Sequence, residues 1–272
     1  MQTPAPVRAR QRASDTRDPF FATTLARGLE VLAAFRPGDV GVGNAELAQR
    51  TGLTRPTVSR MTNTLLQLGY VQRGRDGRYR LSAHVLRLAY PVLAQLRIRQ
   101  LAHPLMREFA EQMRGTVSIG TFDGLELVYI ETVRTNDAAD FVPDIGLNLS
   151  LVQSAMGRAL VSMLPDTEAQ ALLERVRVAS PDLWQRYQGA AERSIEQCRT
   201  QGFCVSTDGL RQEVHAVGAP IMTSPDGDRL AINCGIPVYR LRPGQLEQET
   251  GPRLAALAAS IRGLALRGNI AI

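Results

Sequence analysis

The sequence predicts an α+β protein with a small helical domain ending in a β-hairpin, followed by a larger domain with a mainly antiparallel sheet. Three observations predict this class. Apolar residues recur at helical spacing up to Phe109, strand-like alternation starts after Gly115, and the basic excess is confined to the first 80 residues. With 272 residues, the chain is long enough for two domains with a core each.

Two helices are predicted at the start of the first domain. The first begins at Thr24 and ends before Pro37-Gly38, and we expect its buried face to carry Leu25, Leu29, Leu32 and Phe35. The second is short and begins at Asn44, whose side chain is the expected N-cap. Gly52 ends it, because glycine readily adopts the left-handed conformation that turns the chain sharply.

A third helix follows the turn, with Thr54 as its cap and Pro56 in its first turn, where no N–H is needed. One face forms an apolar stripe of Val58, Met61, Leu65 and Leu68. The other face carries guanidinium, hydroxyl and amide groups, which bond base edges and phosphates in the major groove of DNA. These groups belong to Arg55, Thr57, Ser59, Arg60 and Asn63.

A basic hairpin is predicted after this helix. Residues 70–73 and 78–81 flank Gly74-Arg75-Asp76-Gly77, a strand–turn–strand pattern. Arg73, Arg75 and Arg78 would lie beside a phosphate backbone. Taken alone, the helix is typical of core packing and the hairpin of a solvated edge. Their order and close spacing favour a winged helix-turn-helix that binds double-stranded DNA.

The charge distribution points to the same domain. Residues 1–80 contain 13 arginines and six acidic residues, whereas residues 81–272 contain 19 arginines and 20 acidic residues. The chain has no lysine. Only the segment with the helix-turn-helix pattern therefore has the excess positive charge that phosphate binding requires.

The predicted domain organisation is a disordered tail at 1–19, a DNA-binding domain at 20–82, a linker helix at 83–100 and a second domain at 101–272. Pro91 and Pro104 interrupt the apolar helical pattern between residues 83 and 114, so we expect a kinked connector and then a second helix that begins the next domain. The leftover apolar residues of the connector suit either contact with a second copy of the chain or cover for its own domain. The second domain has predicted strands at 116–122, 126–133, 203–207, 214–222 and 229–238, and helices at 154–164, 166–176, 190–201 and 244–266.

Few residues in the second domain suggest catalysis. The common nucleotide-binding, hydrolase and metalloprotease motifs are not found. Cys198, Cys204 and His215 match no standard zinc spacing, so we expect core cysteines, no metal and no cofactor.

Three cysteines without a CxxC motif suit a reducing compartment. The sequence shows neither a signal peptide nor an apolar run of about 18 residues, so we expect a cytoplasmic protein without membrane contact.

The segment 149–157 is the candidate ligand site. Ser154, Ala155 and Gly157 are small residues at the start of a predicted helix, where exposed backbone N–H groups favour an anion such as a carboxylate. The alternative is that these small residues only allow close packing of the helix on the sheet.

Several motifs together resemble the IclR-type bacterial transcriptional regulators over nearly the whole chain after Phe20. In the first domain they are Leu25-Ala26-Arg27-Gly28-Leu29-Glu30-Val31-Leu32, Leu47-Ala48, Thr51-Gly52-Leu53, Thr57-Val58-Ser59-Arg60, Leu68-Gly69-Tyr70-Val71 and Tyr79-Arg80-Leu81. In the second they are Gly157-Arg158-Ala159-Leu160, Gly202-Phe203 and Ala219-Pro220-Ile221. The chain departs from the family pattern at Ser150-Leu151-Val152, where Pro-Leu-His is frequent, and at Arg158, where Lys is usual.

The resemblance implies a winged helix-turn-helix, a linker helix and a GAF-like effector domain, assembled as a homodimer or a dimer of dimers on operator DNA. It also implies a small organic acid as effector. The pocket positions carried over from the family are Phe141, Leu149, Ser154, Ala155, Met156, Ser206, Ala216 and Cys234. The rival hypotheses are an enzyme fused to a DNA-binding head, using Cys234 or Asp208, and a chromosome-binding protein without a ligand.

Overall fold

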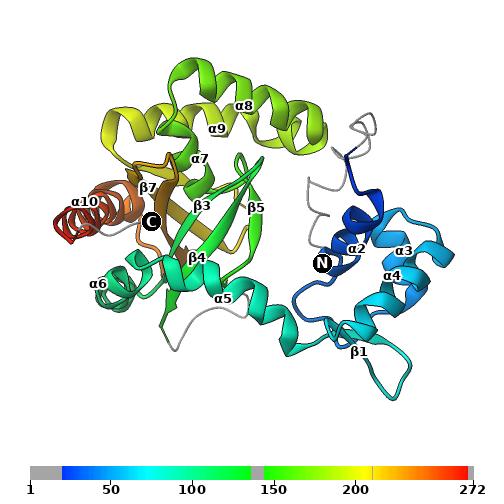
Figure 1. The fold of residues 1–272 in the computed structure, drawn as a ribbon. Coiled ribbons are helices and arrows are strands. Elements are labelled where there is room, and N and C mark those ends of the chain that lie inside the picture. Colours follow the sequence, from blue (N-terminus) through cyan, green and yellow to red (C-terminus); the bar gives the residue numbers. More distant parts are fainter. Residues whose placement is uncertain (1–19, 136–143, 210, 269–272) are drawn as a thin grey trace. The chain divides into compact units, whose positions relative to one another are not determined.

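The computed structural model describes residues 20–135, 144–209 and 211–268 (Figure 1). The chain divides into two compact units, Met1–Ala94 and Gln95–Ile272. The predicted disordered tail at 1–19 lies outside the described residues. None of the described helices is long and apolar enough to cross a membrane.

Between residues 20 and 82, the described part of the first unit consists of three helices and a hairpin. Its elements are α2 (Thr23–Ala33), α3 (Asn44–Thr51), α4 (Arg55–Gln67), β1 (Val71–Arg73) and β2 (Tyr79–Leu81). Gly52, with φ at 72°, ends α3 as predicted, and the Thr54 side chain caps α4 by accepting from the Thr57 backbone N–H at 3.4 Å. The core consists of Val31, Val42, Leu47, Val58, Met61, Leu65 and Val71. The α+β class and the winged helix-turn-helix are therefore confirmed.

Two details of the predicted packing are wrong. Leu25 and Leu29 are 64% and 47% exposed, because α2 turns Ala26 and Val31 towards the core instead. A Cβ atom on Gly28 would lie 3.9 Å from Met61 Sδ, an ordinary van der Waals distance between α2 and α4. Leu68 is also exposed, since it follows the last turn of α4.

Arg50 of α3 links several parts of the first unit by hydrogen bonds and ion pairs. Its guanidinium forms a two-point ion pair with Asp39, with Nη1–Oδ2 at 2.6 Å and Nη2–Oδ1 at 3.0 Å, and it also donates to Glu46 and to the Ala34 carbonyl. The Arg50 hydrogen bonds hold the pKa of Asp39 below its usual value. The loop between α2 and α3 is thereby fixed to α3.

A connector helix and a second helix follow, as predicted, but the interruption between them lies away from the two prolines. A 3₁₀ turn, η2 (Ala83–Val85), leads into α5 (Leu86–Gln95), and α6 (Ile98–Met113) follows. The helical conformation is interrupted at Leu96-Arg97, between α5 and α6, while Pro91 and Pro104 lie inside continuous helices. A proline removes one i to i−4 hydrogen bond, and each helix continues past that loss. No residue of α5 is buried.

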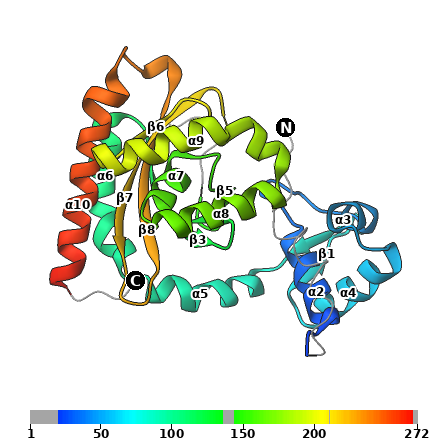
Figure 2. The same ribbon diagram turned by 90° about the horizontal axis from the view of Figure 1, so that it is seen from above.

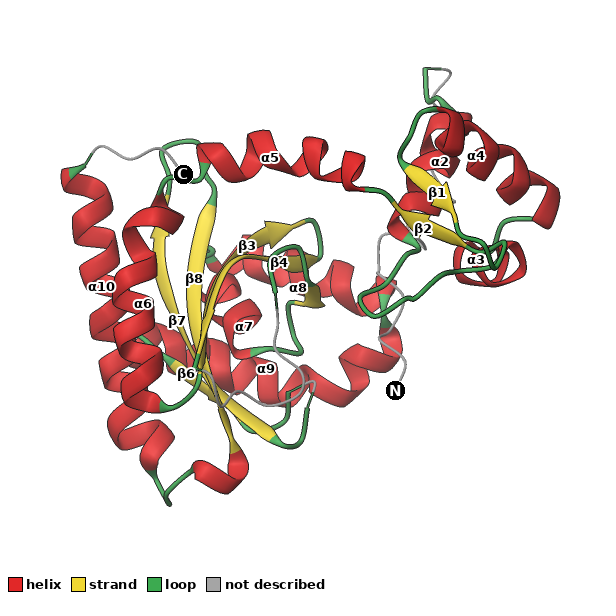
Figure 3. Cartoon of the chain, turned by 90° about the horizontal axis from the view of Figure 1, so that it is seen from below, coloured by secondary structure: helices red, strands yellow, loops and turns green. Residues whose placement is uncertain are grey.

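Within the described part of the second unit, six strands form one antiparallel sheet in the order β5-β4-β3-β8-β7-β6 (Figure 3). The strands are β3 (Thr116–Asp123), β4 (Glu126–Arg134), β5 (Asn148–Ser150), β6 (Cys204–Ser206), β7 (Val214–Thr223) and β8 (Arg229–Pro237). The β3–β4 hairpin and the last two strands match the predicted ranges closely. The short strand β5 was not predicted.

Helices cover both faces of this sheet (Figure 2). One face packs against α6 and α10 (Gly251–Arg267), which is preceded by η3 (Val238–Arg240) and the π-helical turn η4 (Leu246–Thr250). The other face packs against α7 (Ala155–Ser162) and α9 (Pro181–Gln201), with α8 (Asp166–Ala179) against α9. Helix α9 starts nine residues before its predicted start at 190.

Two glycines set the position of α7. A Cβ atom on Gly218 of β7 would lie 2.4 Å from the Ala155 carbonyl oxygen, and one on Gly157 would lie 2.4 Å from the Leu151 carbonyl oxygen. Both distances are too short for any real side chain. The start of α7 therefore lies directly against the backbone of β7 and against the backbone of Leu151, which agrees with the packing alternative for the small residues.

Candidate functional site

The solvent side of α4 carries the predicted DNA-contacting residues. Because Val58, Met61 and Leu65 are buried, the opposite face points to solvent. On that face Arg55, Ser59, Arg60 and Asn63 are exposed, and Thr57 is half-buried. The first unit thus presents guanidinium, hydroxyl and amide groups on one helix surface.

Two of these groups already have partners within the unit. The Thr57 hydroxyl lies 2.9 Å from the Thr54 hydroxyl, and Ser59 Oγ accepts from Asn44 Nδ2 at 2.6 Å. The expected N-cap role of Asn44 is wrong: Gly43 occupies the N-cap position, and the Asn44 amide instead reaches α4. Sequence reasoning missed this role because an asparagine at the start of a helix is equally suited to capping that helix and to hydrogen bonding with a neighbouring helix.

The wing arginines are not equivalent. Arg78 pairs with Glu46 at 3.0 Å, and Arg73 Nε donates to the Gly77 carbonyl at 3.1 Å. Arg75 is exposed in the turn of the hairpin. We therefore expect Arg75 to offer more uncompensated charge than Arg78.

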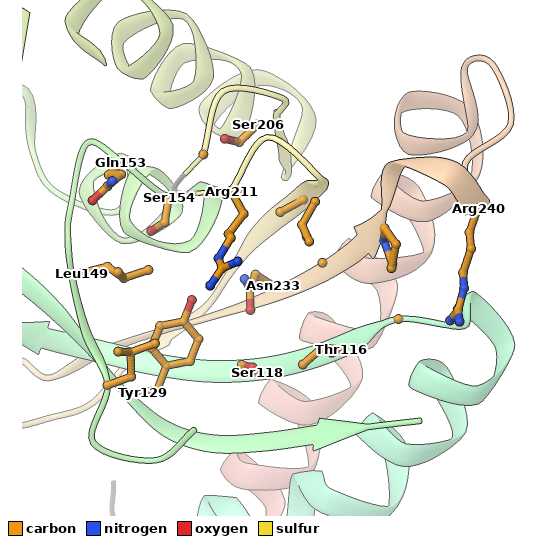
Figure 4. Close-up of a pocket in the computed structure, with 18 of the residues that line it drawn as sticks. Thr116, Ser118, Tyr129, Leu149, Gln153, Ser154, Ser206, Arg211, Asn233 and Arg240 are labelled. Carbon is orange, nitrogen blue, oxygen red and sulfur yellow. The ribbon is translucent and has the colours of Figure 1, made fainter. Parts of the chain in front are cut away.

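A cavity of about 110 Å³ lies in the second unit, on the α7 side of the sheet (Figure 4). Its floor consists of alternate residues of three neighbouring strands, as the pleat requires. They are Thr116 and Ser118 of β3, Val214 and Ala216 of β7, and Asn233, Gly235 and Pro237 of β8. The β5 segment and the start of α7 supply its walls, with Leu147, Leu149, Gln153, Ser154 and Ala155.

The charged residues lining the cavity are all basic. They are Arg114, Arg211 and Arg240, and the described lining contains no acidic residue. Arg240 Nη1 donates to the Arg114 carbonyl at 3.2 Å. That carbonyl is placed by a left-handed backbone at Arg114, with φ of 53°, which no other non-glycine residue in the described ranges adopts. Positive φ is uncommon for such residues.

One end of the cavity is polar as well as basic. The Arg211 guanidinium points towards the hydroxyl of Tyr129 and the amide of Asn233 (Figure 4). Burial raises the pKa of Tyr129 above its usual value, although hydrogen bonding by Asn233 acts in the opposite direction. Asn233 Oδ1 is buried and accepts no hydrogen bond from the described part of the protein.

Five of the eight residues predicted for the pocket line this cavity: Leu149, Ser154, Ala155, Ser206 and Ala216. Two others do not. Cys234 faces the α6–α10 side, because it alternates with Asn233 and Gly235 along β8. Met156 packs on the sheet at Gly120. Phe141 lies outside the described residues.

Sequence reasoning missed the three arginines of the lining and several of its polar residues, among them Tyr129 and Asn233. Strand alternation could have indicated Asn233 and Tyr129, because their neighbours along β8 and β4 are core residues. Arg114, Arg211 and Arg240 lie just outside strands, and no periodic pattern marks residues at such positions.

Neither residue named for the enzyme hypothesis is available as a nucleophile or a base. Asp208 forms a two-point ion pair with the buried Arg158. Burial raises the pKa of Cys234 to about 12, so its thiol stays protonated at neutral pH. Within the described ranges, no three histidine, cysteine or acidic residues are grouped so that they could hold a metal ion.

The first unit is a helix-turn-helix with an exposed polar helix face, and the second holds an arginine-lined cavity. This combination defines a DNA-binding transcriptional regulator. Two family models match the chain: the IclR helix-turn-helix domain at residues 24–75 and the bacterial transcriptional regulator IclR C-terminal domain at residues 90–262. The chain belongs to the IclR family of bacterial transcriptional regulators.

Similar proteins cover most of the chain. The HTH-type transcriptional regulator TsaQ1/TsaQ2 of Comamonas testosteroni is 29% identical over 88% of this chain and 87% of its own length. The Pca regulon regulatory protein of Pseudomonas putida is 30% identical over 90% and 85%. A crystal structure of an IclR family transcriptional regulator from Brucella abortus has a TM-score of 0.81 and 34% identity, over 96% of this chain and 99% of that one. These relatives are named as regulators, and the family is one of DNA-binding proteins, not of enzymes.

Proposed function

We propose that this regulator controls a catabolic operon in the cytoplasm by binding operator DNA through the first unit and a small organic acid in the cavity. The carrying observation is the composition of the cavity lining, with three arginines and no acidic residue in its described part. An anion is the ligand that such a lining favours, because arginine binds carboxylates by charge-assisted hydrogen bonds.

The carboxylate would bind at the polar end of the cavity. There Arg211 points towards Tyr129 and Asn233, and Ser154 and Ala155 at the start of α7 line the same cavity. The Ser154 hydroxyl caps the helix by accepting from the Gly157 backbone N–H at 3.0 Å. The first backbone N–H groups of α7 and the helix dipole add to the attraction for an anion. Close packing and anion binding at this helix start are therefore compatible.

The DNA contacts would come from α4 and the wing. Arg55, Arg60 and Asn63 are exposed on α4, and in a major groove their side chains could bond base edges. Thr57 and Ser59 would contact DNA while keeping their hydrogen bonds to Thr54 and Asn44. Arg73, Arg75 and Arg78 would bind phosphates beside the groove.

We further propose that the regulator acts as a homodimer or a dimer of dimers. Leu86, Leu88, Tyr90 and Val92 of α5 are all more than half exposed, and Leu25 of α2 is 64% exposed. The alternative that the connector covers its own domain fits α6, where Phe109 is buried in the core of the second unit, but no residue of α5 is buried. Light scattering after gel filtration tests this proposal, and a monomer at micromolar concentration would contradict it.

Allosteric control requires that the acid binds one state of the regulator better than another. The test has two arms. A promoter fragment should bind in preference to scrambled duplex at moderate ionic strength, and small carboxylic acids should raise the melting temperature and change operator affinity. Equal binding to both duplexes would contradict operator recognition. Failure of every acid to alter stability would contradict the effector assignment.

A further inference from the structure

One side chain at the start of α3 is bonded to the exposed face of α4. Asn44 Nδ2 donates to Ser59 Oγ at 2.6 Å and to the Arg55 carbonyl oxygen at 3.4 Å. The carbonyl can only accept, so it sets the orientation of the amide. The reverse orientation would place Oδ1 against this carbonyl and the amide nitrogen where Oδ1 is now buried, without a partner among the described groups. Ser59 Oγ therefore accepts from Asn44.

The hydroxyl of Thr64, also exposed on α4, shows what Ser59 would otherwise do. Thr64 Oγ1 donates to the Arg60 carbonyl at 3.1 Å, four residues earlier in the helix. The corresponding carbonyl for Ser59 is that of Arg55, which already accepts from Asn44. In the described part of the chain no group accepts from the Ser59 hydroxyl. Its hydrogen is therefore directed outwards.

An outward hydroxyl hydrogen selects hydrogen-bond acceptors. Ser59 lies on the α4 face that also exposes Arg55, Arg60 and Asn63. In the major groove guanine, adenine and thymine each present an acceptor, whereas cytosine presents only its N4 amino group, a donor. Two donors facing each other would both lose their partners. Because Ser59 accepts from Asn44, its O–H bond is also polarised and donates more strongly.

We propose that Asn44 is a positioning residue for sequence recognition. It orients the Ser59 hydroxyl as a donor, so that Ser59 accepts guanine, adenine or thymine at one operator position and rejects cytosine there. This inference rests on the proposed contact between α4 and DNA, since it names the class of base that one of these contacts selects.

The test measures base preference rather than affinity alone. The full-length regulator selects its preferred site from a random duplex library, and Kd is then measured for this site and for each single substitution to cytosine on either strand. Cytosine at the base that Ser59 contacts should weaken binding to the wild type about fivefold or more, as is usual for a mismatched base pair. In Ser59→Ala this cytosine penalty should fall to about twofold or less, while the penalties at other positions persist.

Asn44→Asp is the most direct variant, because it keeps the shape of the side chain and replaces its donor with an acceptor. The Ser59 hydrogen would then donate to the carboxylate, leaving only lone pairs towards the groove. The cytosine penalty should fall to about twofold or less at the same position, and adding Ser59→Ala should change it no further. The new negative charge weakens binding to all duplexes alike, so it cancels in the ratio.

Thr64→Ala is the matched control, since the Thr64 hydrogen is already used by the Arg60 carbonyl. It should leave every ratio as in the wild type. Melting temperatures show whether the variants fold. If Asn44→Asp does not fold, Asn44→Ala gives the same comparison, because Ser59 could then donate to the Arg55 carbonyl within the helix.

Three outcomes would count against the inference. An unchanged cytosine penalty in a folded Asn44→Asp, with weaker binding to all sites, would reduce Asn44 to a structural role and overturn it. Equal losses on all sites in Ser59→Ala would place the hydroxyl on a phosphate and overturn it as well, leaving DNA binding by α4 intact. A wild type that selects no site would contradict the proposed function, and this inference with it.

Discussion

Arg158 and Asp208 form a two-point ion pair, with Nη1–Oδ1 at 2.9 Å and Nη2–Oδ2 at 2.8 Å. Arg158 is 1% exposed on α7, and Asp208 lies between β6 and β7. Ser206, which lines the cavity, donates to the same carboxylate at 3.0 Å. The pair therefore joins the helix at the cavity wall to the segment that leads to Arg211.

Asp208→Asn should destabilise the second unit, because Arg158 would remain buried without a counter-charge. Buried pairs lose about 3–5 kcal/mol when one partner is removed. The Asp208 side chain is 35% exposed, so we expect about 2 kcal/mol after allowing for solvent screening. Urea denaturation at pH 7 measures this loss, and a variant as stable as the wild type would contradict the role of the pair.

The same pair predicts a pH dependence. Burial is the largest single effect and raises the pKa of Asp208, but the hydrogen bonds and charge of Arg158 together with hydrogen bonds from Ser206 and the backbone outweigh it, so the net pKa lies below its usual value. A lowered pKa stabilises the fold above the unfolded value of about 3.9 and loses this effect as pH falls towards the folded pKa. The stability difference between wild type and Asp208→Asn should therefore shrink below about pH 4. A difference that stays constant from pH 7 to pH 3 would count against the assignment.

Gly218→Ala should displace the start of α7, since the new Cβ would lie 2.4 Å from the Ala155 carbonyl oxygen. We expect a loss of about 3 kcal/mol or more, typical of severe overpacking, together with weakened acid binding. Gly189→Ala is the matched control in α9, where the Cβ would meet only the Arg193 guanidinium at 3.4 Å. It should stabilise the protein by about 0.5–1 kcal/mol, as expected for glycine in a helix. Thermal denaturation of both variants measures these opposite changes in stability, and a Gly218→Ala variant as stable as the wild type would contradict the close contact at α7.

The wing arginines should differ in their salt dependence. Arg75→Ala should weaken binding to operator and random duplex alike and reduce the slope of log K against log salt by about one unit. Arg78→Ala should have a smaller effect, because Glu46 already offsets its charge. Arg60→Ala should weaken operator binding more than random binding. Equal losses for Arg60→Ala on both duplexes would contradict the division between base and phosphate contacts.

Ala155→Phe should abolish the response to acids while leaving operator affinity unchanged without effector. Ala155 is 1% exposed and lines the cavity, so a bulky side chain there would fill it or push α7 away. Melting temperature reports whether the variant folds, and titration of operator DNA with and without acid reports the response. A folded variant with a normal response would remove this segment from the ligand site.

Local patterns predicted most of the elements but not the positions of their side chains. The turn at Gly52, the cap at Thr54 and the β3–β4 hairpin depend on neighbouring residues, so sequence reasoning found them. The exposed Leu25 and Leu29 were assigned to the core because helical spacing shows that a face is apolar and not what covers it. Strand β5 escaped because three residues carry too little periodicity, and it forms only by pairing with β4.

The cavity was predicted in part for a related reason. Ser154 and Ala155 follow from a helix start, and Ser206 and Ala216 from family resemblance. Asn233 and the three arginines come together only when β3 and β8 become neighbours, although more than 100 positions separate Ser118 from its partner Asn233. A pairing across such a distance leaves no mark in local sequence.

The two outermost strands of the sheet, β5 and β6, are only three residues long. A sheet margin with unpaired N–H and C=O groups can recruit strands from other molecules, and short margins restrict that recruitment. The concentrated protein should therefore resist fibrillar association, and insertions that extend either strand should make it prone to aggregate.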